Sequence, residues 1–219
     1  TCNNFATTDA VKDTPTNNFC TFNPLDEGAI TLSEGNLKVT RDSAHETVMG
    51  TFGMASGKWY FEVYNGTSNA DGTLVGVGSN AGILNSHVGS TATSWGYENS
   101  GLIWNNNSGT GSNASVSNGD IFGIAYDADG GTIKFYKNNT LQSDTYSSIT
   151  ANSYMPHVSL YHSGSFVVAN FGQDSSFAGN KTAQGNKDGS GQGDFYYSPP
   201  SGYKALCSAN LPDPTIKLP

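Results

Sequence analysis

Hydrophobic and polar residues alternate along most of this chain, as is typical of short β-strands. The clearest case is Gly119–Thr140, GDIFGIAYDADGGTIKFYKNNT, where two alternating runs flank an acidic turn that contains glycine. In the run 121–126, odd-numbered residues share one face and even-numbered residues the other. After the turn, Ile133 and Phe135 share a face opposite to their neighbours. Alternation with period two around Asp-Gly predicts a β-hairpin.

The same pattern predicts further strands, each bounded by turn-forming residues. The strongest is Trp59–Tyr64, whose odd-numbered side chains face one way and even-numbered side chains the other. Leu74–Gly78 (LVGVG) carries glycine at every second position near its end, which suits the close approach of another backbone or ring. The remaining predicted strands are Ile30–Leu32, Leu37–Val39, Val48–Phe52, Trp95–Tyr97, Leu102–Trp104, Tyr154–Tyr161 and Phe166–Phe171.

Two polar stretches interrupt the alternation. Asn105–Asn113 contains no apolar residue and is expected to be an exposed loop, and residues 172–194 show no apolar period. No run of ten or more residues has helical spacing of apolar positions. About a dozen short strands with frequent turns predict an all-β fold, an antiparallel two-sheet β-sandwich with very little helix.

The 219 residues are enough for one sandwich domain. We assign residues 1–18 to a leader or linker, 19–207 to the sandwich and 208–219 to a proline-rich C-terminal linker. The start at Thr1 and the spaced prolines of the last segment suggest a piece of a longer polypeptide.

The charge composition argues against several classes of partner. The formal net charge is −8, and the ten Lys and Arg residues are dispersed. A nucleic-acid backbone is bound by clustered basic residues, so we expect neither nucleic-acid binding nor docking on an anionic membrane. No apolar segment approaches the roughly 20 residues that span a bilayer. Only 13% of residues are charged, which suits polar, uncharged ligands.

The sequence offers no convincing metal site or cofactor site. The four histidines lack ligand spacing and there is no CxxC, which argues against zinc. Asp127-Ala128-Asp129-Gly130 could begin a calcium loop, but Asn138 stands where the bidentate Glu is required. We therefore interpret this segment as a hairpin turn.

Catalytic patterns are also missing. There is no G-x-S-x-G elbow, and no histidine is flanked in the sequence by a recognisable acidic partner. Glu62 lies on a predicted strand, but no second strand-borne acid stands out as its partner for glycoside cleavage. We expect the protein not to be an enzyme.

Aromatic residues next to amides are the better candidates for a site. Trp104 ends a predicted strand and leads into Asn105, Asn106 and Asn107, and aromatic rings with amide side chains are suited to sugar rings and their hydroxyls. Tyr161 and His162, at a late turn, form a second candidate. Trp95 and Tyr97 are expected in the core.

Several segments, in their order along the chain, resemble the motifs of the SPRY family. The hairpin 119–140 is similar to the family's GD-x-φ-G-φ-A-φ-D … G-T-φ-x-F-Y-x-N-G strand pair, where φ is apolar. The resemblance covers roughly residues 45–172. The other matching segments are Gly57–Val63, Gly76–Gly78, Ser94–Tyr97, Gly101–Trp104, Met155–Leu160 and Ser165–Phe171.

This resemblance implies a sandwich of the SPRY or concanavalin A-like jelly-roll type, used as a binding module and not known for catalysis. Ligand contacts in this fold come from variable loops, so no residue role carries over. The fold also brings the first and last strands together, which would place Cys20 near Cys207. A Cys2–Cys20 disulfide and free thiols remain the alternatives, because three cysteines cannot all pair within the chain.

The end segments Pro15–Asp26 and Pro200–Pro214 are similar to modules of tailed-bacteriophage structural proteins. This likeness implies a virion-surface, extracellular location on a tail or capsid fibre, where a homotrimer through a parent fibre is one arrangement. The domain would recognise a host-surface glycan or protein. The alternative is a structural decoration domain that contacts other virion proteins, and a more distant one is an accessory domain of a secreted hydrolase.

Overall fold

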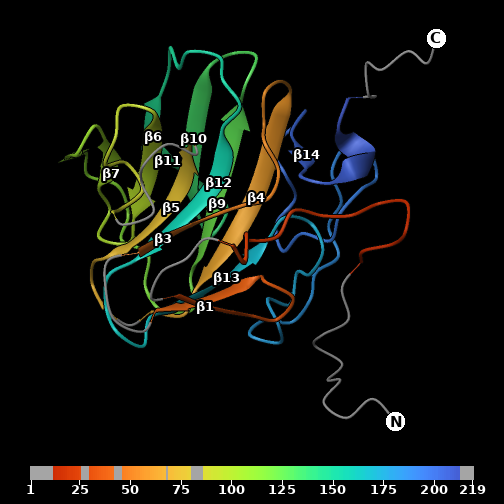
Figure 1. The fold of residues 1–219 in the computed structure, drawn as a ribbon, viewed down its shortest axis with the longest axis horizontal. Helices are drawn as coiled ribbons and strands as arrows, with labels where there is room; N and C mark the ends of the chain where they lie inside the picture. Colours follow the sequence, from red (N-terminus) through yellow and green to blue (C-terminus); the bar gives the residue numbers. More distant parts are fainter. Residues whose placement is uncertain (1–11, 26–29, 42–45, 68, 80–85, 213–219) are drawn as a thin grey trace.

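The computed structural model describes residues 12–25, 30–41, 46–67, 69–79 and 86–212. Two antiparallel sheets pack face to face, and a long C-terminal segment covers the outer side of the larger sheet (Figure 1). This confirms the predicted all-β sandwich. The only helical element among the described residues is a single 3-10 turn, Ser208–Asn210.

The larger sheet has eight strands. Its order is β1-β2-β13-β4-β9-β10-β11, and β14 pairs in parallel with β4 off this path. The strands are β1 (Ile30–Ser33), β2 (Lys38–Arg41), β4 (Lys58–Asn65), β9 (Ile121–Asp127), β10 (Thr132–Lys137), β11 (Thr140–Tyr146), β13 (Phe166–Asn170) and β14 (Lys204–Ala205).

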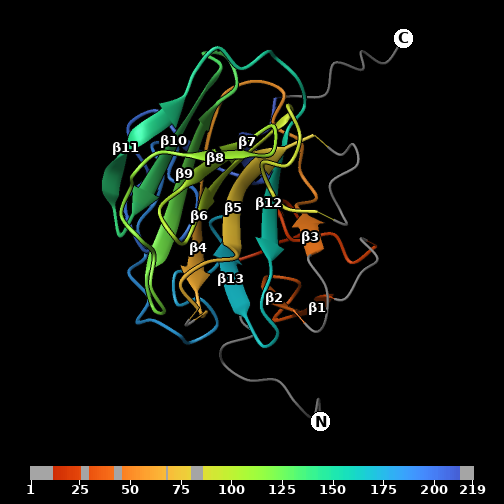
Figure 2. The same ribbon diagram turned by 90° about the vertical axis from the view of Figure 1, so that its left-hand side faces the viewer.

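The smaller sheet has six strands in the order β3-β12-β5-β6-β7-β8, seen in front in Figure 2. Strands β5 to β8 follow one another in sequence and in space, whereas β12 is inserted between β3 and β5. The strands are β3 (Glu46–Met49), β5 (Thr73–Gly78), β6 (Ser94–Glu98), β7 (Ile103–Asn105), β8 (Ser108–Thr110) and β12 (Met155–Leu160).

The face assignments made from the alternation are confirmed. Phe61 and Val63 of β4 and Ile124 of β9 lie in the core between the sheets. Tyr60 and Ala125, on the opposite faces of the same strands, lie in a second, smaller cluster on the outer side of the larger sheet. Strands that bury both faces do not show a clean apolar–polar contrast, which explains the mixed sequence of β4.

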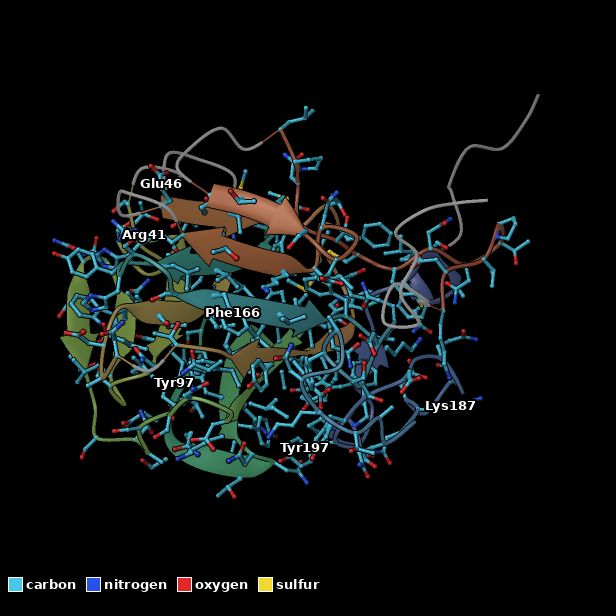
Figure 3. All side chains as sticks on the ribbon, turned by 90° about the horizontal axis from the view of Figure 1, so that it is seen from below. Arg41, Glu46, Tyr97, Phe166, Lys187 and Tyr197 are labelled. Atoms are coloured by element: carbon cyan, nitrogen blue, oxygen red, sulfur yellow. The ribbon has the colours of Figure 1, made fainter. Side chains whose placement is uncertain are left out.

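The second cluster exists because the C-terminal segment, residues 172–210, packs against the outer face of β4 and β9. Phe195, which is fully buried, contacts the Tyr60 ring at a centroid distance of 5.4 Å. In Figure 3 this segment is coloured blue, and its Lys187 lies on the opposite side of the molecule from Tyr97 of the core. The polar stretch 172–194 is therefore a covering layer of the sandwich.

Polar side chains hold this covering layer in place. Asp188 accepts hydrogen bonds from four donors: the backbone N–H groups of Ser190, Gln192 and Ala205, and the Asn210 amide. Such side-chain acceptors satisfy backbone groups that have no strand partner. A segment without apolar periodicity can thereby take a fixed conformation.

Glu62, at the centre of the larger sheet's outer face, is fully buried under the covering layer. Its carboxylate accepts hydrogen bonds from the backbone N–H groups of Tyr196 and Tyr197 at 2.8 and 2.7 Å, from the Tyr60 hydroxyl and from the Asn170 amide. Burial raises its pKa to about 7 despite these four donors. Glu62 fastens the C-terminal segment to β4.

The structure corrects three local predictions. Asn105–Asn113 is only partly a loop, because β7 and β8 form a hairpin with Asn106 and Asn107 as its turn. Both turn residues have positive φ (51° and 58°), which asparagine tolerates well. Strand β11 lies in a region where no strand was predicted, and β3 begins earlier than Val48.

The predicted approach of Cys20 and Cys207 is correct for the backbone but yields no disulfide. Phe19 pairs with Cys207, and the Cys20 N–H donates to the Leu206 carbonyl at 2.9 Å. Because side chains alternate, Cys20 enters the main core while Cys207 enters the outer cluster. Both are buried free thiols, and Cys2 lies outside the described residues.

The acidic turn after β9 is occupied by internal contacts. Asp127 pairs with Lys58 at 2.9 Å and accepts from the Gly130 N–H, and Asp129 accepts from the Gly57 N–H. Within the described residues, no group of three or more His, Cys, Asp or Glu side chains is placed to hold a metal ion. The same part of the chain contains no helix long and apolar enough to cross a membrane.

Candidate ligand-binding site

A cavity of about 210 Å³ opens on the outer side of the smaller sheet, near the start of β5 and the end of β6. Two of the aromatic residues predicted from the sequence, Trp104 and Tyr161, meet there although 57 positions separate them. We call it the Trp104 cavity. It is lined by Asp71, Gly72, Leu74, His87, Glu98, Trp104 and Tyr161.

Strand register brings the lining together. Leu74 of β5 lies opposite Glu98 of β6, and Gly96 of β6 lies opposite Trp104 of β7. These residues share the face that points away from the core. Tyr161 directly follows β12, on the other side of β5.

The Trp104 ring lies flat on β8 because its cross-strand partner is glycine. A Cβ added to Gly109 would lie 2.6 Å from the Trp104 Cε2. The edge of the His87 ring meets Trp104 at a centroid distance of 5.0 Å and an interplanar angle of 80°. The indole is thus held between a strand and a loop, with part of it open to the cavity.

Glu98 fixes the indole from the other side. Its carboxylate accepts hydrogen bonds from Trp104 Nε1 at 3.1 Å, from the Ser100 hydroxyl at 2.6 Å and from the Gly72 N–H at 3.3 Å. Glu98 is only 8% exposed, so these bonds form largely out of water. The carboxylate therefore preorganises the cavity wall.

Tyr161 forms the exposed rim of the cavity, with 52% of its surface accessible. The Arg41 guanidinium lies 5.7 Å from its ring centroid, and the His162 ring contacts it edge-on at 5.0 Å. His162 Nε2 is in turn 2.8 Å from the Asp71 carboxylate. His162 does not line the cavity, but it positions Asp71, which does.

His87 contributes a neutral imidazole. Burial lowers its pKa from the ordinary value, and the nearby Glu98 carboxylate opposes that shift only in part. The acidic side chains in the cavity wall are those of Asp71 and Glu98.

The three asparagines predicted beside Trp104 do not join it. Asn106 and Asn107 form the β7–β8 turn, and their backbone N–H groups donate to the carbonyls of Thr91 and Gly89. Asn105 follows Trp104 on the strand, so its side chain points to the opposite face. There it donates to three backbone carbonyls, which include that of Ser94 at 2.8 Å.

Sequence reasoning missed Asp71, His87 and Glu98. Asp71 and His87 lie on loops, where no periodicity marks a functional residue. Glu98 ends a strand and was not recognised because its partners come from other parts of the chain: Gly72 lies just before β5 and Trp104 lies on β7. The motif Ser94–Tyr97 immediately before Glu98 was the one available signal.

Solved structures similar to this chain share its fold. The SPRY domain of human HERC1 matches with a TM-score of 0.59 and 24% identity, over 68% of this chain and 96% of that domain. The TRIM65 PSpry domain matches with a TM-score of 0.57 and 18% identity, over 69% and 92%. Stonustoxin matches with a TM-score of 0.56 and 24% identity, over 69% of this chain and 27% of the toxin chain.

Comparison of the sequence with curated proteins gave no match. The SPRY domain family model matches residues 58–174, more than half of the chain. This range agrees with the segments whose motifs resemble the family. It includes β4 to β13 and all of the lining of the Trp104 cavity. The chain belongs to the SPRY domain family.

Proposed function

We propose that this SPRY domain is a non-catalytic recognition module that binds a host-surface glycan in the Trp104 cavity. SPRY domains are protein-interaction modules and are generally without catalytic activity. The observation that carries the proposal is the convergence of Trp104 and Tyr161 on one cavity. Aromatic rings stack on the apolar faces of sugar rings.

The carboxylates at the cavity support a ligand rich in hydroxyl groups. Asp71 and Glu98 can accept hydrogen bonds from sugar hydroxyls, and charge-assisted bonds of this kind are stronger than neutral ones. Glu98 is held by Trp104, Ser100 and Gly72 before any ligand arrives, which lowers the entropic cost of binding.

We place the domain on a virion appendage, at the virion surface. This part of the proposal depends on the resemblance of Pro15–Asp26 and Pro200–Pro214 to phage structural modules. A structural decoration domain that contacts other virion proteins is the alternative role, and it does not require the Trp104 cavity.

The test is binding of the domain to a broad glycan panel, followed by two matched variants. Tyr161→Ala removes a cavity residue that is 52% exposed, and Leu141→Ala removes an apolar residue that is 50% exposed on β11, outside the cavity. Both should fold normally because their side chains are half solvated. We expect Tyr161→Ala to weaken binding by about tenfold or more and Leu141→Ala to leave it within about twofold.

Trp104→Phe then separates stacking from the hydrogen bond to Glu98, because it keeps a ring and loses Nε1. A glycan panel without a saturable ligand, or equal losses in the Tyr161 and Leu141 variants, would contradict the proposal. Binding of the purified domain to virus particles that lack it, unaffected by Tyr161→Ala, would favour the decoration role.

A further inference from the structure

A second depression, of about 320 Å³, lies at the opposite end of the smaller sheet from the Trp104 cavity. It is found where β6 and β12 begin and where the segment after β11 crosses the top of the molecule in Figure 1. We call it the Tyr146 groove. Six of its lining residues carry the argument: Trp95, Asn105, Tyr146, Ser147, Ser148 and Thr150.

The groove and the Trp104 cavity are distinct sites, and two neighbouring residues of β7 line one each. Trp104 points to the outer face of the sheet and Asn105 to the other. No residue lines both depressions. The sequence had suggested one site for these two residues.

The lining of the Tyr146 groove is neutral. It contains no Asp, Glu, Lys, Arg or His among the described residues, in contrast to the Trp104 cavity with its two carboxylates. A charged ligand would lose its hydration here without gaining an ion pair. The chemistry of the groove therefore favours an uncharged polar ligand.

Its polar atoms have unused hydrogen-bonding capacity. The hydroxyls of Tyr146, Ser147, Ser148 and Thr150 form no side-chain hydrogen bond within the described residues, and neither does Trp95 Nε1. In the other two tryptophans the indole N–H is already engaged: Trp59 Nε1 donates to the Ser56 carbonyl at 2.7 Å, and Trp104 Nε1 donates to Glu98. The groove thus offers both donors and acceptors.

Asn105 supplies an acceptor that is already oriented. Its Nδ2 donates to the carbonyls of Thr91 and Ala92, both at 3.3 Å, and of Ser94 at 2.8 Å. The amide is therefore fixed, and its Oδ1 accepts no hydrogen bond from the part of the chain that the structure describes. A fixed acceptor costs little entropy on binding.

Aromatic rings complete the lining. The half-buried Tyr146 packs edge-on against Phe135 of the core at 6.3 Å, and Trp95 meets Tyr154 edge-on at 5.1 Å. Both contacts immobilise rings that border the groove. The volume falls at the lower end of the range of small-molecule sites, about 300–1,000 Å³.

We infer that the Tyr146 groove binds one neutral pyranose ring, with the ring against the aromatic side chains and its hydroxyls on Trp95 Nε1, Asn105 Oδ1 and the serine and threonine hydroxyls. This inference does not depend on the function proposed for the Trp104 cavity. It gives the domain a second carbohydrate site of different charge.

The test is an NMR titration of the domain with methyl glycosides of glucose, galactose and mannose, with glucosamine and glucuronate as charged comparators. The indole N–H of Trp95 should shift saturably with a Kd on the order of millimolar, while that of the buried Trp59 stays fixed. The charged sugars should bind about tenfold more weakly or not at all.

Two threonine variants locate the site. Thr150→Trp fills the groove, and Thr145→Trp is the control, an exposed threonine on β11 that does not line it. Thr150→Trp should abolish the Trp95 shift and Thr145→Trp should keep it, with both variants showing a wild-type melting temperature. Trp104→Ala should leave this titration unchanged, so that failure at one site is distinguishable from failure at the other.

Absence of a Trp95 shift up to about 50 mM of every neutral glycoside would overturn the inference, because a site with a Kd on the order of millimolar would be largely occupied at that concentration. So would a shift that survives Thr150→Trp, or equally strong binding of the charged sugars.

Discussion

Single buried titratable residues in this domain have larger consequences than its surface charges. Glu62 and His157 are both fully buried, one on each sheet. Burial raises the pKa of Glu62 to about 7 and lowers that of His157 to about 4. The two shifts act on stability in opposite directions as the pH changes.

We predict that Glu62 makes the domain lose stability as the pH rises. Its folded pKa lies above the unfolded value of 4.5, so its contribution is complete below pH 4.5 and is lost as the pH approaches 7. The loss should be about 3 kcal/mol. Urea unfolding of wild type and Glu62→Gln between pH 4.5 and 7.5 measures this loss. The variant should have the lower free energy of unfolding at pH 4.5. The gap between the two free energies should shrink as the pH rises, because only the wild type loses the contribution of Glu62. A difference that does not change with pH would refute the prediction.

His157 should act with the opposite sign. Its Nδ1 lies 2.8 Å from the Met155 carbonyl, which fixes a neutral tautomer, and its Nε2 has no hydrogen-bond partner within the described residues. Its folded pKa lies below 6.5, so stability is present above pH 6.5 and is lost as the pH falls towards 4. In Glu62→Gln, unfolding free energy should therefore rise between pH 4 and 6.5. An imidazole of His157 that titrates near 6.5 by NMR would contradict this.

At the scale of elements, glycines decide how closely strands and rings approach. Gly76 of β5 has no room for a side chain, because an added Cβ would lie 1.9 Å from the Trp95 carbonyl oxygen. The alternating glycines of Leu74–Gly78 were correctly interpreted as a place of close approach. Gly109 of β8 has the same role towards Trp104, but nothing in its polar surroundings marked it.

We predict that Gly109→Ala displaces the Trp104 indole. The new Cβ would meet the ring at 2.6 Å, and the edge strand β8 can shift only partly. Gly109→Ala should lower the free energy of unfolding by about 1–2 kcal/mol. It should also lower ligand affinity at the Trp104 cavity more than the neighbouring control Ser108→Ala does. Tryptophan fluorescence and the glycan assay report the two effects. Unchanged affinity would show that the indole position does not matter for binding.

At the scale of the whole molecule, the C-terminal segment gives the sandwich a third layer. Cys207 lies in the outer cluster beneath this layer, whereas Cys20 lies in the core between the sheets. Regions held mainly by polar contacts open more readily than a hydrophobic core. The two thiols therefore report on two different opening reactions.

We predict that a thiol reagent labels Cys207 well before Cys20. Local opening of the C-terminal layer should expose Cys207, while Cys20, whose pKa burial raises to about 12, requires global unfolding. Mass spectrometry of labelled peptides in low denaturant gives both rates. Equal labelling rates of Cys207 and Cys20 would mean that the layers unfold together, contrary to the prediction. A mass of the intact protein two hydrogens below that of the fully reduced chain would indicate a Cys20–Cys207 disulfide and would contradict the structure.

Much of the fold could be predicted because strand residues alternate with a fixed period. The hairpin 119–140 and the strand Trp59–Tyr64 both expose an apolar face that must be buried, so their position and orientation follow from sequence. Strand β11 could not be found this way. Its residues are mostly polar, and it is held at the sheet edge by its pairing with β10 and by side-chain contacts such as that of Gln142 with the Ala114 N–H.

The candidate site was predictable only in part, because most of its residues come from loops and strand ends that carry no regular alternation. Trp104 and Tyr161 stand out as aromatic residues at strand ends, but their meeting depends on the insertion of β5 between β6 and β12. The partners Asp71 and Glu98 have no local pattern, and the neighbouring Asn105 belongs to another groove because strand geometry turns it away.

The sequence alone determined the fold class, the family and the faces of the main strands, because these depend on local alternation and on motifs that remain contiguous in the chain. Tertiary structure decided which loops converge on each cavity, why Cys20 and Cys207 cannot bond, and how a polar C-terminal stretch becomes a covering layer. Those features depend on contacts between residues far apart in sequence, and periodicity carries no information about such contacts.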